Sequence, residues 1–497
     1  MAAANALITA DVLNYGSTSH SEIEETSTLV DEENVSTLIS EKRTSMKQEL
    51  KTICRTSAPL SVTFFLQYSL PVASTFSVGH ISAKHLAAVS LATMTFNVTS
   101  SIFNGMATCL DTLCPAAFGA GKYKKVGLYF QRCILLMMTL NIFIVLFWWN
   151  SGIFFRLFVK DSSLVALAQS YLRVMTFCTP AYILFEAGKR YLQAQNIFVA
   201  GQYALFIAAP INAFLNYALV WSKHFNLGFL GAPLGTTISY WILPTYLFYY
   251  SRMHSTDKCW AQPNVKAIFR DLKPMASLAI NGTAMLLLEF IAFEILTLCS
   301  ATFGTETLAA QSICSTLATL FFQIPFAASV ASSTRISNLI GETNQRSAKI
   351  ATKATYILSL ALGVLNFCVL FFFRKQIAML FTNDATVIGI AKGVIGILGL
   401  NQFWDAPNIL GAGCLRAQAR QHVGSRLNVI AYYIIGLPIS LFLGFKMDLE
   451  IVGLWIGLLC GVFSLACSEF VCVFLTDWKS VIREAENRNK NRENSTI

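Results

Sequence analysis

Charged residues are scarce in this sequence. Only 13% of its 497 residues are Asp, Glu, Lys or Arg, while 55% are hydrophobic and the mean hydropathy is +0.55. A typical soluble domain carries about 25% charged residues. The composition therefore excludes an ordinary soluble protein and indicates a polytopic membrane protein.

The motifs of several function classes are missing as well. The sequence has no G-x-x-x-x-G-K-[ST] loop, which argues against ATP-driven transport by this chain. Five of the six His fall at loops or at the ends of apolar runs, and no catalytic triad is evident. The 13 Cys lack metal-type spacing, and most lie inside apolar runs as small apolar side chains. We therefore expect no enzyme, no cofactor and no bound metal.

The basic residues do not point to nucleic acid. The net charge is +10, but the Lys and Arg side chains are spread over short loops rather than gathered in one stripe. We expect the lipid bilayer to be the large partner of this chain, and no nucleic acid. We also expect the chain to act as a monomer.

Long apolar runs dominate what is present. A transmembrane helix needs about 20 mostly apolar residues, and runs of this length recur between short polar breaks. They lie near residues 58–79, 86–110, 126–149, 164–187, 198–221, 227–251, 274–300, 307–332, 351–373, 386–412, 427–445 and 450–476. The sequence thus predicts an all-α polytopic membrane protein with twelve transmembrane helices.

The distribution of Lys and Arg sets the expected orientation. With twelve spans, both tails and the loops after the even-numbered helices share one side of the membrane. That side holds 28 of the 37 Lys and Arg residues, and the other side with its adjoining helix ends holds 9. Because cytosolic loops are enriched in basic residues, we predict that both termini are cytosolic.

The two halves of the sequence repeat. Residues 157–161 (LFVKD) recur as residues 380–384 (LFTND), and LQAQ at 192–195 recurs as LRAQ at 415–418 with the same offset. Two further pairs have an offset shorter by one position: 86–88 with 308–310, and 231–235 with 453–457. Several matches in order at nearly one spacing indicate an internal repeat. Six helices per repeat give both halves the same orientation, and such transporters bind substrate between the halves.

These observations predict five segments. They are a disordered cytosolic tail at 1–52, an N-lobe at 53–251, a cytosolic linker at 252–273, a C-lobe at 274–478 and a cytosolic tail at 479–497. The N-terminal segment is rich in Ser, Thr and Glu and poor in apolar residues, which is typical of a disordered tail.

Three acidic residues lie inside predicted spans: Glu289, Glu294 and Asp405. An Asp at the bilayer centre costs on the order of 2.5–3.5 kcal/mol, so such groups face a bundle interior or a water-filled cavity. Burial disfavours the ionised form, so a carboxyl there can take up and release a proton near neutral pH. The alternative is an acid near a helix end that reaches the headgroups. We favour a proton-coupling and cation-binding site.

The spacing of these acids suggests different tasks. Glu289 and Glu294 are five residues apart, about 140° around a straight helix, so they do not share one face. Glu289 is the deeper of the two and the preferred coupling site, whereas Glu294 could line the cavity. Asp405 precedes Pro407, which removes a backbone donor and loosens the helix.

Other residues could complete a cavity. Aromatic faces hold organic cations within about 6 Å, and ordinary packing is the alternative for each aromatic residue. The aromatic candidates are Phe290, Phe293, Trp404, Tyr432 and Tyr433, and helix bends are expected at Pro71, Pro325 and Pro407. Asp111, Glu186 and Glu469 lie near the predicted cytosolic ends of spans, where we expect a structural or snorkelling role.

Two stretches form recognisable motifs: residues 110–122 (LDTLCPAAFGAGK) and Leu288-Glu-Phe-Ile-Ala-Phe-Glu294. They resemble the motif that ends helix 2 and the "LEWW-x-YE" motif of the multidrug and toxic compound extrusion (MATE) family, eukaryotic branch. Three shorter matches follow: Ala310-Gln311-Ser312 to "AQS", Gly411 to Arg416 to "G-V-x-R-G", and Ala431 to Pro438 to "YY-x-x-G-x-P". In order, the matches cover about residues 50–478.

The resemblance implies a fold and an activity. It implies two six-helix lobes forming a V around a central cavity, and exchange of an organic cation, metabolite or toxin for protons. It makes Glu289, Glu294 and Asp405 the acidic cavity residues and adds Gln311 as a cavity-lining candidate. The expected location is the plasma or vacuolar membrane.

The chain departs from the family pattern at several positions. Phe290 and Ile291 replace the paired Trp of "LEWW", which puts cavity shape and substrate range in doubt. Thr307 stands where some animal members have an acid, with Glu306 beside it, and helix 1 carries no acid, so we place coupling in the C-lobe. The alternatives are sodium coupling on the same scaffold, a lipid or oligosaccharide flippase of related fold, and a membrane enzyme such as a lipid transferase.

Overall fold

The computed structural model describes residues 44–490 except 80, 158, 160, 223–226, 255, 261, 263 and 271. The chain divides into two units, Met1–Ser45 and Met46–Ile497, and the architecture below is that of the second. Within the described residues the secondary structure is helical, without strands, as the sequence predicted. Most of the predicted N-terminal tail lies outside the described residues.

The N-terminal half of the second unit runs from Met46 to Met253. Its helices are α4 (Met46–Gly79), α5 (Ala83–Gly119), α6 (Tyr123–Trp149), α7 (Ser151–Phe155), α8 (Ser162–Met175), α9 (Thr179–Ala194), α10 (Ala200–Trp221), the 3-10 turn η1 (Gly228–Leu230) and α11 (Gly231–Met253). The short helices η2 (Thr256–Cys259) and α12 (Val265–Phe269) lie in the predicted linker.

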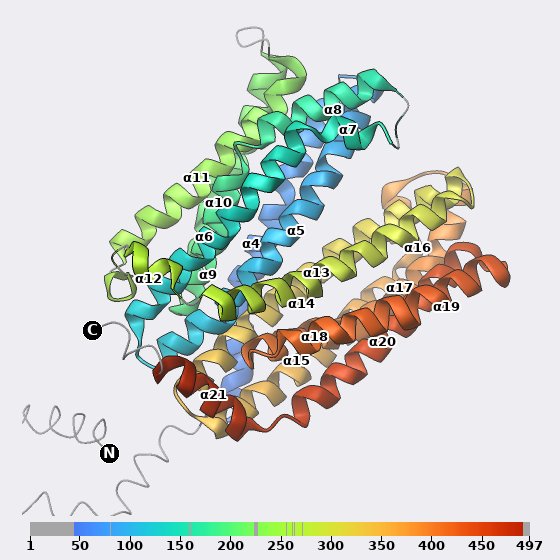
Figure 1. Ribbon diagram of the computed structural model, residues 1–497. Coiled ribbons are helices and arrows are strands. Elements are labelled where there is room, and N and C mark those ends of the chain that lie inside the picture. Colours follow the sequence, from blue (N-terminus) through green and yellow to red (C-terminus); the bar gives the residue numbers. More distant parts are fainter. Residues whose placement is uncertain are drawn as a thin grey trace, which may run out of the picture. The chain divides into compact units, whose positions relative to one another are not determined.

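The C-terminal half begins at Leu272. It contains α13 (Leu272–Ala301), α14 (Thr305–Gly341), α15 (Gln345–Phe372), α16 (Arg374–Phe381), α17 (Ala385–Ala417), α18 (Gln421–Asn428), the π-helix η3 (Val429–Gly436), α19 (Leu437–Leu441), the π-helix η4 (Phe442–Lys446), α20 (Glu450–Phe474) and α21 (Trp478–Lys490). Within this unit the two groups of long helices meet at one end and diverge toward the other (Figure 1).

Nine helical segments of the described chain are long and apolar enough to cross a membrane. Three of the twelve predicted spans are not among them: 58–79 in α4, 164–187 and 227–251 in α11. The span at 164–187 is divided into α8 and α9, because Pro180 at the start of α9 cannot continue the hydrogen-bond ladder of α8. Each of these three segments is nevertheless helical, and the count of twelve spans stays a prediction.

Local geometry repeats between the halves at the offsets seen in the sequence. The side chains of Asp161 and Asp384 cap α8 and α17 by accepting hydrogen bonds from the backbone N–H groups two and three residues further on. Left-handed backbone also occurs in matched pairs: Gly121 with Thr343, Asn196 with Ala419, and Gly228 with Glu450. The internal repeat therefore extends to helix caps and turns.

One of these turns provides a stability prediction. Thr343 has φ 60° and an exposed side chain, while its counterpart is Gly121. A left-handed conformation costs a residue with a Cβ roughly 1–2 kcal/mol, and glycine loses only roughly 0.4–1 kcal/mol through the unfolded chain. We expect Thr343→Gly to stabilise the protein by about 0.5–1 kcal/mol, measured by thermal unfolding in detergent. The reciprocal Gly121→Thr should lower the melting temperature, and equal melting of all three proteins would contradict the strain.

The structure adds detail to three of the predicted segments. Helix α4 begins at Met46, inside the segment assigned to the disordered tail, because Glu49 in its first turn is buried against Arg335 of α14. The predicted C-terminal tail is helical to Lys490, and its Val481 and Ala485 pack in a cluster with Ile336 of α14. The span predicted at 427–445 is divided by π-helical segments rather than forming one regular α-helix.

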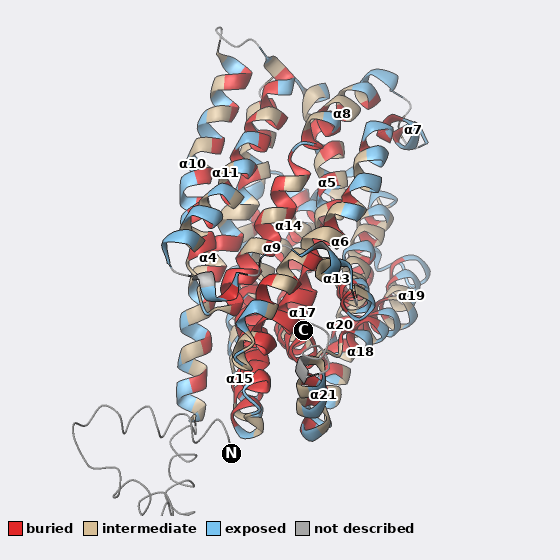
Figure 2. Ribbon diagram, turned by 60° about the vertical axis from the view of Figure 1, so that its left-hand side comes forward, coloured by how far each residue is buried: buried red, intermediate tan, exposed pale blue. Residues whose placement is uncertain are grey.

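The halves are joined by close backbone contacts between α5 and α14. A Cβ on Gly119 would stand 2.1 Å from the Asn338 carbonyl oxygen, and a Cβ on Gly341 2.1 Å from that of Ala116. The two contacts are equivalents of each other in the repeat, since Ala116 corresponds to Asn338 and Gly119 to Gly341. Only glycine permits this approach. Figure 2 shows much of α14 and α17 buried, as expected for helices at the centre of the unit.

An ion pair and hydrogen bonds also join the two halves. The Arg335 guanidinium binds both carboxylate oxygens of Glu49, with Nε–Oε2 and Nη2–Oε1 distances of 2.9 and 2.7 Å. The Thr112 hydroxyl donates to the Arg416 carbonyl oxygen (2.6 Å) and accepts from the Gln421 amide (2.8 Å). These links join α4 to α14, and α5 to α17 and α18.

Candidate functional site

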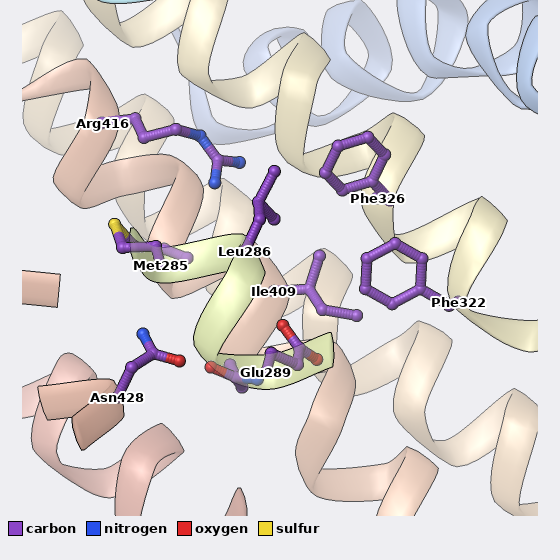
Figure 3. A pocket seen from close by; sticks show the side chains of 10 residues that line it. Met285, Leu286, Glu289, Phe322, Phe326, Ile409, Arg416 and Asn428 are labelled. Atoms are coloured by element: carbon purple, nitrogen blue, oxygen red, sulfur yellow. The ribbon is translucent and has the colours of Figure 1, made fainter. Parts of the chain in front are cut away.

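A small pocket in the C-terminal half is built around Glu289. Its volume is about 20 Å³, enough for about one water molecule or a small ion. Its walls come from α13, α14, α17 and α18. The lining residues are Met285, Leu286, Glu289, Phe322, Phe326, Asn408, Ile409, Ala412, Arg416 and Asn428. Figure 3 shows Glu289 and Arg416 at opposite ends of the pocket, with Leu286 and Ile409 between them.

Asp405 of α17 does not line the pocket itself but lies three residues before Asn408, which does. It is buried, and its carboxylate accepts hydrogen bonds from the Gln402 amide (3.2 Å) and the Asn408 amide (3.1 Å). Asn408 also lines the pocket, so it connects the two acids. Glu289 and Asp405 are close enough to interact electrostatically.

The π-helix η3 brings two tyrosines to the same region. Tyr432 is buried and interacts with the Glu289 carboxyl. Tyr433, the next residue, also contacts α13, because its hydroxyl donates to the Leu288 carbonyl oxygen (2.9 Å). A π-helix widens the turn and shifts the register of the side chains that follow it, and such segments are frequent at functional sites.

Arg416 is the cation of the pocket. It lies in the last turn of α17, where the helix dipole favours positive charge. It is buried, and its Nη2 donates to the Ser329 hydroxyl (2.7 Å). It also interacts electrostatically with Glu289, with Asp111 of the N-terminal half and with Glu469 of α20. Arg416 is therefore influenced electrostatically by carboxyls on three different helices.

Several predicted cavity residues lie elsewhere. Glu294 is half-buried on α13 but does not line the pocket. Gln311 is buried within α14, where its amide donates to Thr297 and Ser315 and its carbonyl accepts from Trp455, so it is a structural residue.

The remaining aromatic candidates pack outside the pocket. Trp404 stands edge-on to Phe463 with 4.7 Å between ring centroids, and Phe293 packs against Trp455 at 6.1 Å. Phe290 is exposed on the helix surface. Pro71, Pro325 and Pro407 each lie inside a helix, α4, α14 and α17, and the bends expected there stay a prediction.

The N-terminal half contains a closed cluster of four charged residues. Glu186 is fully buried and binds Lys189 (Oε1–Nζ 2.7 Å) and Arg190 (Oε2–Nη1 2.5 Å). The Arg190 Nε also lies 3.3 Å from Asp111 Oδ1. Gln67 bridges the first pair, donating to Glu186 and accepting from Lys189, each at 2.9 Å. The sequence analysis expected a structural or snorkelling role for these acids, and both carboxylates are paired in the interior rather than reaching the headgroups.

This cluster and the pocket occupy equivalent places in the two repeats. When α4 is aligned with α13 and α9 with α17 at the repeat offsets, five residues in and around the cluster correspond to five residues that line the pocket. The pairs are Phe64 with Leu286, Gln67 with Glu289, Phe185 with Asn408, Glu186 with Ile409, and Lys189 with Ala412. The N-terminal half thus holds an ammonium group, that of Lys189, at the place where the C-terminal half has a carboxylate-lined pocket.

The surroundings of Lys189 show how this fold can hold a cation. Its Nζ lies 4.9 Å from the ring centre of Phe64 and 5.1 Å from that of Phe185, in addition to its bonds to Glu186 and Gln67. Carboxylate, amide oxygen and aromatic faces together are the groups that stabilise a buried ammonium ion.

Comparison with known proteins agrees with this architecture. The MatE family model matches the chain twice, over residues 59–218 and 283–442, once in each half. The chain belongs to the MATE family. This confirms the family resemblance seen in the sequence, the two-lobe all-α membrane fold, and a transporter rather than an enzyme.

Individual MATE relatives and structures cover most of the chain. An uncharacterized transporter of Saccharomyces cerevisiae is 39% identical over 442 residues, which is 89% of this chain and 64% of that protein. Protein DETOXIFICATION 16 of Arabidopsis thaliana is 32% identical over 91% of this chain and 93% of its own length. The crystal structure of the eukaryotic MATE transporter AtDTX14 superposes with a TM-score of 0.83 at 27% identity, covering 89% of this chain and 98% of that one.

Two functional features escaped the sequence analysis. Arg416 and Asn428 line the pocket but were not proposed as site residues. Arg416 was counted among loop charges, since it falls at the end of a predicted span. The signal that could have found it is the repeat itself, because Gln193 occupies the corresponding position of LQAQ.

Proposed function

We propose that this MATE transporter exports organic cations or amphipathic metabolites in exchange for protons, with coupling at Glu289 and Asp405. The observation that carries the proposal is the pocket around Glu289, which takes the place of an ion-paired lysine in the other repeat. A carboxylate in this place attracts a cation, and a proton competes with that cation.

The pocket supports a role in coupling rather than in holding the whole substrate. Its volume of about 20 Å³ suits a proton, a water molecule or a small ion. A larger organic cation would bind in the space between the halves, with its charge directed at Glu289. Glu294, one and a half turns further along α13, is proposed to attract that cation without itself coupling to protons.

The proposed cycle follows from charge. Facing outward, Glu289 or Asp405 takes a proton and loses its attraction for the cation, which leaves. The neutral site then turns to the cytosol, where the proton dissociates and the restored charge binds the next cation. Protonation supplies the difference in affinity between the two states that any coupled transporter requires.

The test is uptake of ethidium, a fluorescent organic cation, into proteoliposomes of the purified protein under an imposed pH gradient. We expect uptake when the gradient drives protons out of the vesicle, and its loss when an ionophore collapses the gradient. Uptake that responds only to a sodium gradient would replace the proton by sodium on the same scaffold. No response to either gradient would overturn cation exchange and favour a lipid or oligosaccharide substrate.

Orientation and location belong to the same proposal. The excess of basic residues on one side supports cytosolic termini, and the plasma membrane and the vacuolar membrane both suit an exporter of metabolites. We propose that one chain suffices for transport, because each half contributes one of the two equivalent polar sites.

A further inference from the structure

A carboxyl that has no part in the proposed cycle lies in the centre of the C-terminal half. Glu469 of α20 is fully buried, and no side chain among the described residues donates a hydrogen bond to either of its oxygens. It fits because α17 has a glycine opposite: a Cβ on Gly411 would stand 2.8 Å from Glu469 Oε2 and 2.9 Å from the Tyr356 hydroxyl. The next residue, Ala412, lines the Glu289 pocket.

The other repeat shows that the fold does not need a carboxyl here. At the repeat offsets, Gly411 corresponds to Gly188 and Glu469 corresponds to Leu247. A Cβ on Gly188 would stand 3.2 Å from the Leu247 side chain, so the same glycine contact exists in both halves. Leu247 is buried in the apolar core. A leucine fills this place in one half, whereas the other half buries an acid at considerable cost.

Several ionisable groups face Glu469 from the helices around it. They are Arg416, Asp405 and Cys414 on α17, Glu289 on α13, Tyr432 on η3 and Tyr356 on α15. Arg416 is the one cation in this set, and it also serves Glu289. A single guanidinium cannot fully compensate two buried carboxylates at once, so the charge of one acid influences the protonation of the other.

We propose that Glu469 is a further proton-exchanging residue of this half, which gains and loses its proton in opposition to Glu289, with Arg416 as the cation available to both carboxyls. This rests on the proposed cation site at Glu289. When Glu289 is ionised and empty, Arg416 compensates it, and Glu469 forms an O–H bond with a proton taken from water. When a cation or proton neutralises Glu289, Arg416 compensates Glu469 instead. The O–H bond of Glu469 then breaks and the proton returns to water.

The first experiment asks whether Glu469 titrates, independently of transport. Infrared difference spectra of the purified full-length protein are recorded between high and low pH for wild type and Glu469→Gln. We expect the wild type to show a carboxylic-acid band that Glu469→Gln lacks and Glu469→Asp retains at a shifted frequency. Identical carboxylic-acid bands in wild type and Glu469→Gln would overturn the proposal.

The second experiment tests the opposition to Glu289. Proton release on addition of ethidium is measured with a pH-sensitive dye. At a pH at which Glu289 is ionised before ethidium binds, we expect Glu469→Gln to release about one proton fewer per bound cation than the wild type, because the linked group is gone. Unchanged proton release would refute the coupling.

Folding and function are separated by two controls. Glu469→Leu copies the packing of Leu247 and serves as the comparison protein if Glu469→Gln does not fold, with the same expected loss of band and of proton. If the wild type binds no ethidium, the proposed function fails, while the infrared titration still decides whether Glu469 exchanges a proton.

Discussion

Glu289→Gln is expected to reduce pH-driven ethidium uptake to the level of vesicles without protein. Glutamine preserves the shape of the side chain and its place in the pocket, but it cannot ionise, so the site loses both its attraction for a cation and its response to protons. Because Gln67 already occupies the equivalent position in the N-terminal half, the substitution should be compatible with folding. Uptake is followed by fluorescence after the same pH jump as for the wild type.

The matched control for this variant lies on the same helix. Glu294→Gln removes a carboxylate that does not line the pocket. It should raise the ethidium concentration needed for half-maximal uptake while leaving the dependence on the pH gradient in place. Size-exclusion profiles and melting temperatures of both variants should match the wild type. Normal pH-driven uptake by Glu289→Gln, or complete loss in Glu294→Gln alone, would show that the coupling site has been misplaced.

Glu186→Leu should destabilise the protein far more than the substitutions at Glu289, Glu294 or Gly121. It removes the only carboxylate that binds Lys189 among the described residues, and Lys189 keeps the Gln67 amide oxygen as its hydrogen-bond acceptor. Arg190 keeps Asp111 as its carboxylate partner and its hydrogen bond to Asn104. Removing one partner of a buried ion pair typically costs about 3–5 kcal/mol. We expect a clearly lowered melting temperature in detergent and reduced yield of folded protein.

A double variant shows whether the loss comes from the orphaned charge. Glu186→Leu/Lys189→Met removes both members of the pair, and apolar replacement of a buried pair is often close to neutral. It should recover much of the lost stability. A double variant as unstable as Glu186→Leu would attribute the loss to packing instead. The rescued protein would also show whether the N-terminal cluster takes part in transport or only supports the fold.

The large features of this protein follow from periodicity and length, which a sequence displays directly. The apolar runs correspond to helices, and the repeat offsets correspond to matched helix caps and turns. The acids inside predicted spans lie on α13 and α17. The pairing of Glu186 with Lys189 and Arg190 was missed because these residues sit near a predicted span end, where charges are normally solvated. They meet Gln67 and Asp111, which are distant in sequence, and no local pattern reports such a contact.

The charge count used for orientation has the same weakness. Four described Lys and Arg residues assigned to the cytosolic side are buried: Arg132, Lys189, Arg190 and Arg416. Without them the difference is 24 against 9, so the predicted orientation does not depend on them. Gln311 shows a limit of a different kind: the family resemblance made it a cavity-lining candidate, and the structure shows that its side chain is hydrogen-bonded to Thr297, Ser315 and Trp455.

The contacts that join the two halves can be strengthened only to a limited extent before they hinder transport. The proposed cycle requires the two halves to move relative to each other, and the Glu49–Arg335 pair and the hydrogen bonds of Thr112 cross between them. A hydrogen bond contributes only about 0.5–1.5 kcal/mol net, and every 1.4 kcal/mol changes the ratio of two states about tenfold. Two or three additional links across α5 and α14 would therefore trap the closed arrangement in nearly every molecule. A variant selected for high thermal stability through additional contacts between the halves would therefore transport more slowly. The few close contacts at Gly119 and Gly341 hold the halves together while still allowing them to separate.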